Sequence, residues 1–229
     1  KLGAKFISDE VASIEKTAEG FSVKTGNEEY LATAVILAFG LTPRDLNVPG
    51  EEKFKGRGVS YCATCDGPLF RGKTVAVIGG GNAALEAAEY LSKLAAKVIM
   101  INNAAKFIGE EGMYDQVAAI SNVEMHYNLT TTEVIGEAKV EKITAKNSET
   151  GAIEEFTIDG VFVEIGHAPK TEWLKDFVSL NEKKEVIVDM NMRTRIEGLF
   201  AAGDLRSGSR RQIVMAAADG ATAALGAYE

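Results

Sequence analysis

Hydrophobic and polar residues alternate near the start of the chain and then give way to an apolar run. Residues 5–7 and 20–24 alternate as short strands do when one face is buried, and Gly26 with Asn27 marks a turn. Residues 34–38 form an uninterrupted apolar run, which is typical of a buried strand. The pattern predicts a small antiparallel hairpin that leads into a buried strand ending at Gly40.

The middle of the chain has the pattern of a βαβ unit. Residues 73–78 form a short apolar strand, a helical stripe covers residues 82–94, and a second apolar strand covers residues 98–101. The turn that follows the first strand matches a dinucleotide fingerprint, with Gly79 for the tight turn and Gly81 for backbone approach to a pyrophosphate. Two further positions are predicted to serve this site: Asn82 begins the helix whose N-terminus attracts anions, and Ala84 permits close helix packing.

A second set of alternating segments follows and predicts a meander inserted before the last strand of the nucleotide domain. The predicted strands are residues 134–136, 140–145 and 153–158, followed by a buried strand at residues 160–165. The chain closes with a small-residue helix over residues 212–228. The order of strands and helices predicts an α/β fold.

Composition sets limits on partners and location. The chain has 229 residues, 46% of them hydrophobic, and is long enough for one large or two ordinary domains. Its net charge of −8 argues against nucleic acid as the main partner, because Arg206, Arg210 and Arg211 are the nearest approach to a basic cluster. No apolar stretch has membrane-spanning length, so we expect a soluble, cytoplasmic protein that does not bind membranes.

The only two cysteines, Cys62 and Cys65, are separated by two residues. This spacing is typical of a disulfide that opens and closes, and the neighbouring Asp66 is available to move a proton. A structural zinc site needs four ligands, and only His126 and His167 could join the thiols, so we expect no metal. A static disulfide is the other alternative, although such a short bridge would add little stability.

Five motifs in a fixed order resemble the low-molecular-weight thioredoxin reductases of bacteria and archaea. They are Cys62-Ala63-Thr64-Cys65-Asp66-Gly67, Gly79-Gly80-Gly81-Asn82-Ala83-Ala84, Gly166-His167-Ala168-Pro169, Phe200-Ala201-Ala202-Gly203-Asp204, and Arg211-Gln212 before Ala216-Ala217-Ala218-Asp219-Gly220. No single requirement of a fold would produce all five motifs together.

The resemblance implies two Rossmann-like nucleotide-binding domains of the three-layer FAD and NAD(P) type, one inserted into the other. Residues 1–43 and 167–229 would form the FAD domain, and residues 44–166 would form the pyridine-nucleotide domain with the redox disulfide. Cys65 would face the flavin, Cys62 would attack the disulfide of thioredoxin, and Asp66 would be the acid and base. The implied FAD-binding residues are Gly40, Gly203, Asp204, Arg211, Gln212 and Ile213.

Two departures from the family pattern change these expectations. The family's FAD domain opens with its own strand, glycine turn and helix, which do not precede Lys1, so we expect a fragment that lacks about the first 70–80 residues. NADPH-using members also carry arginines after the second strand, where residues 102–108 hold only one cation, Lys106. The acidic residue that binds the ribose of NADH is missing as well. We expect poor use of NADPH, with NADH or another reductant as the donor.

The sequence therefore predicts a thioredoxin-disulfide reductase, a homodimer that uses FAD to reduce Cys62–Cys65 and then a thioredoxin-like partner. The inserted domain is expected to rotate about residues 41–50 and 166–170, because flavin and partner cannot reach the same dithiol at once. Two alternatives stay open: the flavoprotein reductase of a peroxiredoxin system, and a non-catalytic module that senses nucleotides or redox state. The last helix has a plainer interpretation too, as an alanine-rich packing helix.

Overall fold

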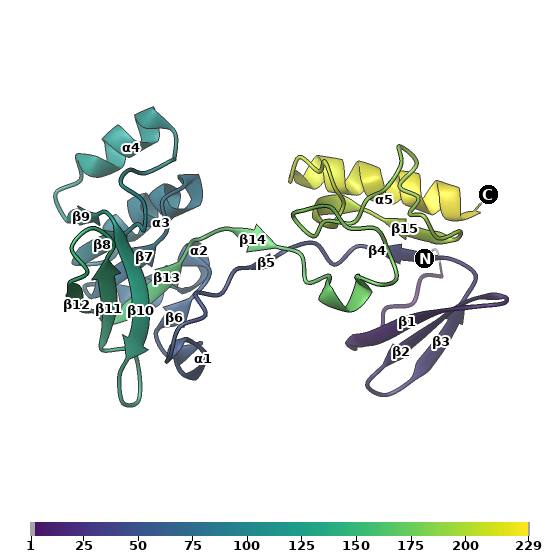
Figure 1. Cartoon of the computed structure of the whole chain (residues 1–229), viewed down its shortest axis with the longest axis horizontal. Coiled ribbons are helices and arrows are strands. Elements are labelled where there is room, and N and C mark those ends of the chain that lie inside the picture. Colours follow the sequence, from purple (N-terminus) through teal and green to yellow (C-terminus); the bar gives the residue numbers. More distant parts are fainter. Residues whose placement is uncertain (1–2, 229) are drawn as a thin grey trace. The chain divides into compact units, whose positions relative to one another are not determined.

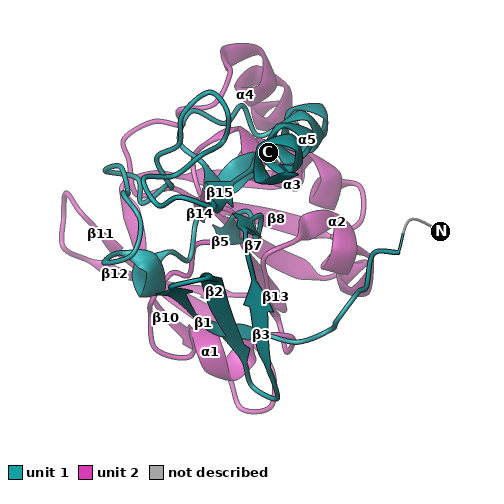
Figure 2. Cartoon of the chain, turned by 90° about the vertical axis from the view of Figure 1, so that its right-hand side faces the viewer, with its two compact units in different colours: residues 1–42, 168–229 teal, residues 43–167 magenta. Residues whose placement is uncertain are grey.

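The computed structural model describes residues 3–228 and divides into two compact units. One unit consists of Lys1–Thr42 and Ala168–Glu229, and the other is the continuous segment Pro43–His167 (Figures 1 and 2). Within residues 3–228, no helix is both long and apolar enough to span a bilayer. Which nucleotide each unit holds stays a prediction.

The unit Pro43–His167 is built on a five-stranded parallel sheet. Its strands are β6 (Val59–Ser60), β13 (Gly160–Val163), β7 (Thr74–Ile78), β8 (Lys97–Ile101) and β9 (Val123–His126), in that spatial order. The order β9-β8-β7-β13 is that of a Rossmann half, in which the direction of winding changes between β7 and β13. Ligands of such sheets bind beyond the carboxyl ends of the strands at this point, and the predicted glycine turn follows β7.

Both faces of this sheet are covered, which explains why its strands are continuously apolar. Val75 and Val77 of β7 pack with the helices α3 (Asn82–Ser92) and α4 (Glu111–Ala118). Ala76 and Ile78 point to the opposite face and pack with an antiparallel meander. The meander consists of β10 (Leu129–Ile135), β11 (Lys142–Asn147) and β12 (Ile153–Thr157). The predicted βαβ unit and the three-layer α/β fold are confirmed.

The segment between β6 and β7 forms α2 (Ala63–Asp66) and the 3₁₀ helix η1 (Gly67–Phe70). Gly67 lies directly against α3, since an added Cβ would come within 3.0 Å of both Leu91 and Tyr90. The helix α3 thus supports the cysteine-containing segment at its side and the glycine turn at its start. The short helix α1 (Glu51–Phe54) precedes β6.

Two short strands, β5 (Thr42–Pro43) and β14 (His167–Ala168), lie where the chain passes between the units. They pair as a two-stranded sheet, and next to it the Arg44 amide donates to the Gly166 carbonyl at 2.9 Å.

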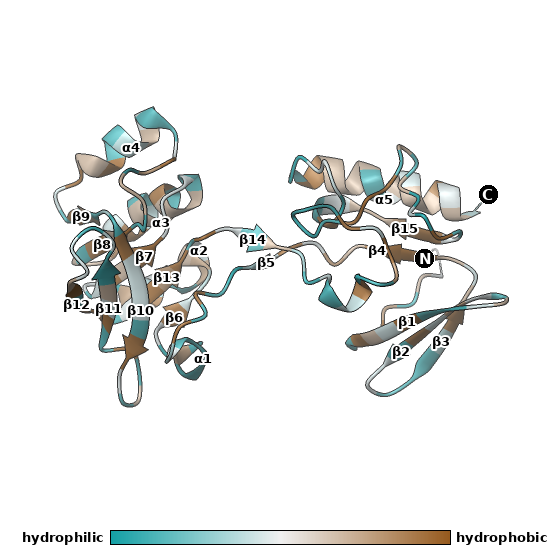
Figure 3. Ribbon diagram, viewed as in Figure 1, coloured by the Kyte–Doolittle hydropathy of each residue, from teal (hydrophilic) through white to brown (hydrophobic). Residues whose placement is uncertain are grey.

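The other unit combines an antiparallel sheet with a short parallel one. The first sheet contains β1 (Val11–Thr17), β2 (Gly20–Thr25) and β3 (Glu29–Ala32), and the second pairs β4 (Val35–Leu37) with β15 (Leu199–Ala201). Two 3₁₀ helices, η2 (Glu172–Leu174) and η3 (Gly203–Leu205), and the helix α5 (Ile213–Tyr228) complete it. Its core gathers Phe21, Leu37, Leu174, Leu199 and Leu205. Figure 3 shows β4 as hydrophobic and α5 as mostly pale, in keeping with its small residues.

Two expectations about individual elements are wrong, and other elements were missed. Residues 5–7 form no strand, and Phe6 is 94% exposed, because β1 supplies the partner of β2 instead. The strand at residues 34–38 is shorter and only partly buried, with Ile36 36% exposed, since β4 pairs with β15 alone. The helix α4 and the strand β9 were not predicted, because α4 buries only Val117 and has a weak apolar stripe.

Candidate redox and nucleotide sites

The two cysteines form a disulfide at the start of α2. Their Cα atoms are 5.3 Å apart, and Cys62 occupies the N-cap position of the helix. The amide of Cys65 donates to the Cys62 sulfur at 3.2 Å. Cys65 is exposed and Cys62 is half-buried. A backbone donor aimed at sulfur would favour its thiolate form once the disulfide is reduced.

Asp66 is held within the same segment by Ser60, a residue that sequence reasoning missed. The Ser60 hydroxyl donates to the Asp66 carboxylate at 2.7 Å and accepts from the Cys62 amide at 3.1 Å. Ser60 is only 4% exposed and ends β6. Its one signal in the sequence is its place beside Tyr61-Cys62, because β6 was not predicted. The hydroxyl therefore joins the predicted proton carrier to the backbone of the half-buried cysteine.

Tyr61 anchors the cysteine segment on its other side. Its hydroxyl lies 2.7 Å from the Glu51 carboxylate and 2.9 Å from that of Asp45. Burial and these two carboxylates raise the pKa of Tyr61 well above its usual value, so the hydroxyl stays protonated and donates. Glu51 is buried and also accepts from the amides of Leu46 and Asn47, both at 2.7 Å. The segment carrying the disulfide is thus fixed to residues 45–51.

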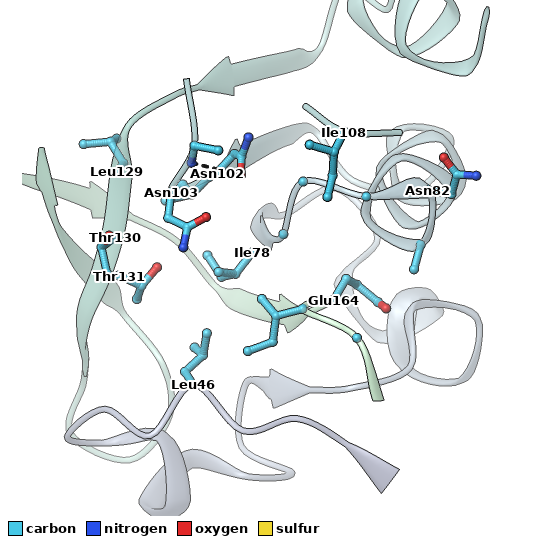
Figure 4. A pocket seen from close by; sticks show the side chains of 18 residues that line it. Leu46, Ile78, Asn82, Asn102, Asn103, Ile108, Leu129, Thr130, Thr131 and Glu164 are labelled. Carbon is cyan, nitrogen blue, oxygen red and sulfur yellow. Dashed lines mark hydrogen bonds between the residues drawn. The ribbon is translucent and has the colours of Figure 1, made fainter. Parts of the chain in front are cut away.

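A pocket of about 580 Å³ opens at the carboxyl ends of β7, β8 and β13 (Figure 4). It brings together the glycine turn with Asn82, the residues after β8, the start of β10 and the residues after β13. Its lining residues are Leu46, Ile78, Gly79, Gly80, Gly81, Asn82, Ala83, Ile101, Asn102, Asn103, Ala104, Ile108, Leu129, Thr130, Thr131, Glu164, Ile165 and Gly166. The pocket lies where a doubly wound sheet binds nucleotides.

The glycine turn has the geometry that its pattern implies. Gly79 has φ 148°, and an added Cβ would lie 2.3 Å from the Glu164 carbonyl oxygen, so a side chain would push β7 and β13 apart. An added Cβ at Gly81 would meet nothing, which leaves its backbone open to a ligand. Ala84 is fully buried and does not line the pocket, so it packs beneath the turn. The Asn82 side chain accepts from the Glu110 amide at 2.7 Å.

Among the described residues, Glu164 is the only ionisable side chain that lines this pocket, and sequence reasoning missed it as well. Burial and the nearby carboxylate of Glu86 raise the pKa of Glu164 to about 7. Lys106 is exposed and does not line the pocket. Within the described part of the chain, no group of three or more potential metal-binding side chains comes together.

The other unit holds the residues predicted to bind FAD. Gly40 and Gly203 have φ values of 65° and 73°, and an added Cβ at Gly40 would meet nothing, so a cofactor could approach this backbone closely. Asp204 lies in η3 and accepts from the Ser209 hydroxyl at 3.2 Å. The residues Arg211, Gln212 and Ile213 are all exposed at the start of α5. The chemistry of these groups fits a flavin nucleotide.

An ion pair that was not predicted holds η3, the 3₁₀ helix that contains Gly203 and Asp204. Arg206 donates to both carboxylate oxygens of the buried Asp219, at 2.7 and 2.9 Å. The Gly203 amide reaches the same carboxylate at 3.3 Å. Asp219 of α5 thus fixes η3 and the backbone on either side of Asp204.

A Rossmann-type unit that joins a glycine turn to a redox-spaced disulfide defines the class of nucleotide-linked disulfide oxidoreductases. The sequence profile of the pyridine nucleotide-disulphide oxidoreductases matches residues 2–220. The chain belongs to this family.

Its similarity extends to named relatives. It is 41% identical over 223 residues to a thioredoxin reductase of Treponema pallidum, covering 97% of this chain and 72% of the relative. The solved thioredoxin reductase of T. acidophilum has a TM-score of 0.82 at 40% identity, covering 96% of this chain and 72% of that one. The solved thioredoxin reductase of Lactococcus lactis has a TM-score of 0.85 at 35% identity, covering 96% of this chain and 73% of that one. The predicted resemblance to thioredoxin reductases is confirmed.

A second set of relatives is longer. The chain is 42% identical over 217 residues to the F component of the alkyl hydroperoxide reductase of Staphylococcus aureus, covering 94% of this chain. It spans only 43% of the length of that relative.

Proposed function

We propose that the protein is a FAD-linked disulfide reductase that transfers two electrons to Cys62–Cys65 and then to thioredoxin or a thioredoxin-like protein. One observation carries this proposal: the disulfide, the Asp66 carboxylate and the bridging Ser60 hydroxyl form one connected group. The similarity to thioredoxin reductases supports the choice of partner.

The thiol chemistry balances as two reactions. Two electrons and two protons convert the Cys62–Cys65 disulfide into two thiols. The Cys62 thiolate then attacks the partner's disulfide and forms a mixed disulfide, while one partner sulfur leaves and takes up a proton. The Cys65 thiolate attacks the Cys62 sulfur, which restores the disulfide and releases the second partner thiol. In this proposal, Asp66 gives and receives the protons.

The residues proposed to hold FAD are Gly40, Gly203, Asp204, Arg211, Gln212 and Ile213. When bound, FAD accepts two electrons from a donor and passes them to a disulfide. The exposed start of the 16-residue helix α5 would favour negative charge on a bound flavin, because the amides at a helix N-terminus carry partial positive charge. Asp219 and Arg206 would keep the Gly203 backbone in place for this contact.

A second candidate is the reductase component of a peroxiredoxin system. The 42% identity to the F component of an alkyl hydroperoxide reductase favours it, and the chemistry of the disulfide would be unchanged. The two candidates differ in the partner that is reduced. A module that only senses nucleotides or redox state would carry out neither reaction.

The first experiment combines a visible spectrum with reduction of a partner. The purified full-length protein should bind FAD and show flavin absorbance, and dithionite reduction should produce two titratable thiols per chain. Mixing the reduced protein with oxidised thioredoxin or with an oxidised peroxiredoxin then identifies the partner. Two new thiols without transfer to either partner would favour a sensor, and absence of the thiols would contradict the proposal.

The same resemblance supports a homodimer, and two cysteines in a redox spacing support a reducing, cytoplasmic location. Analytical ultracentrifugation of the purified protein tests the first of these inferences. A monomer at all concentrations would contradict it.

A further inference from the structure

The adenosine end of the nucleotide pocket lies after β8, because the residue at the end of the second strand of a Rossmann unit contacts the ribose. Asn102 occupies this position and is only 4% exposed. Its amide nitrogen donates to the Lys106 carbonyl at 2.8 Å, and its oxygen accepts from the Ala104 amide at 3.3 Å. Asn102 therefore holds the loop that follows β8, and another residue is needed to bind the ribose.

Thr131 has the properties that such a residue requires. It lines the pocket and is 7% exposed. Among the described residues 3–228, the Thr131 hydroxyl oxygen is the one buried side-chain nitrogen or oxygen atom without a hydrogen-bond partner. Burying a hydroxyl without a partner is unfavourable, so an unpaired hydroxyl on a pocket wall indicates a ligand group.

Strand alternation explains why Thr131 points inward, because Leu129 and Thr131 are two residues apart on the same face of β10 and both are buried. The pairing of β10 with β11 shifts register between Thr131 and Glu133, which marks a β-bulge. The bulge follows Thr131 and leaves its direction unchanged, and such bulges occur often beside binding sites. The next hydroxyl, that of Thr132, lies 2.9 Å from the Thr144 hydroxyl. Figure 4 shows the Thr131 oxygen and the Asn103 amide directed toward the same part of the pocket.

The charge of the lining indicates which adenosine can enter. Within residues 3–228, no lysine or arginine lines the pocket, and Glu164 is its only ionisable group. A 2′-phosphate would bring extra negative charge into a pocket that offers it no cation, whereas a free 2′-hydroxyl needs only polar, uncharged partners.

We propose that Thr131, together with Asn103, hydrogen-bonds the adenosine ribose of an NAD-type nucleotide, and that this neutral subsite selects a free 2′-hydroxyl over a 2′-phosphate. The inference rests on the proposed function in one respect: the pocket is the site where the proposed reductase binds its electron donor. In this proposal, Thr131 of β10 binds the ribose, because the side chain of Asn102 after β8 is engaged in holding the loop.

The test is calorimetric titration of the purified protein with NAD⁺ and with NADP⁺, which measures binding without turnover. We expect NAD⁺ to bind at least about tenfold more tightly, because the 2′-phosphate lacks a charged partner. Thr131→Val keeps the shape of the side chain and should weaken NAD⁺ binding by about fivefold. The matched control is Thr132→Val, which alters the next hydroxyl on the strand and should leave the affinity unchanged.

A melting curve separates recognition from a structural role. Because the Thr131 hydroxyl has no partner in the protein, Thr131→Val should leave the Tm equal or higher while the affinity falls. An unchanged NAD⁺ affinity in this variant, or tighter binding of NADP⁺ by the unmodified protein, would overturn the inference. Absence of binding by both nucleotides, with dithionite-reduced protein still reducing its partner, would overturn it and leave the proposed function intact.

Discussion

The disulfide segment and the nucleotide pocket belong to the same unit but differ in how their polar groups are satisfied. Around the disulfide, Ser60, Tyr61 and Glu51 each have partners within the protein. In the pocket, the Thr131 hydroxyl has none, and Gly81 leaves its backbone open. The comparison shows that the thiol chemistry is organised before a partner arrives, whereas the pocket is completed by its ligand.

Removal of either thiol is expected to have the largest effect on activity. Cys62→Ser and Cys65→Ser should each abolish disulfide reduction, since one sulfur cannot carry two electrons as a disulfide. Flavin absorbance and the Tm should stay close to those of the unmodified protein. The assay is reduction of the partner's disulfide, and Thr64→Ser, which keeps both thiols, is the control. Most of the activity surviving in either cysteine variant would refute the relay.

The next largest effect is expected at the proton carrier. Asp66→Asn should slow reduction of the partner by about 10²-fold, the usual scale of general acid-base catalysis. Ser60→Ala should give a smaller loss, because it removes one hydrogen bond to Asp66 and leaves the carboxylate in place. Rapid mixing with partner across a range of pH measures both. An unchanged rate and pH profile for Asp66→Asn would reassign this residue to a structural role.

Adding positive charge should change the nucleotide that the pocket accepts. Asn103 and Ala104 both line the pocket, so Asn103→Arg combined with Ala104→Arg should improve NADPH use by at least about tenfold. NADH use should fall, because Asn103 is one of the two residues proposed to hydrogen-bond the ribose of NAD. Flavin reduction by each nucleotide in stopped flow is the measurement. The control is Ala105→Arg, which adds positive charge at an exposed residue outside the pocket lining.

If Ala105→Arg improved NADPH use by the same factor, the improvement would come from long-range charge and not from a contact in the pocket. If the unmodified protein already reacts rapidly with NADPH and the double variant gains nothing, then the loop after β8 does not contact the adenosine phosphate.

The smallest expected effect is on stability and comes from Glu164. Its folded pKa of about 7 lies above the ordinary value of 4.5, so its ionisation opposes folding. The stability is fully present below about pH 4.5 and falls as the pH rises through 7. Glu164→Gln should flatten this dependence and raise the Tm by about 1–2 °C at pH 8, a small shift because the group is partly solvated. Melting curves at about pH 5 and pH 8 test it, with Glu86→Gln expected to give part of the effect.

Much of the fold and of the redox site could be predicted from the sequence, because the signals are local. The strands β7 and β8, the helix α3 and the turn at Gly79 follow from the periodicity of apolar residues over short stretches. The cysteine pair and Asp66 are neighbours along the chain, so their proximity needs no tertiary information. The strand β4 was predicted less well, because its exposure depends on how many neighbouring strands pair with it.

The sequence by itself therefore determined the α/β class, the glycine turn and the cysteine pair. Only the tertiary structure decided which distant residues complete the sites. Thr131 and Glu164 lie far along the chain from Gly79, and parallel pairing of β13 with β7 and the packing of the meander bring them to one pocket. Such contacts depend on strand order, bulges and packing between layers, and none of these leaves a repeating pattern in the amino-acid sequence.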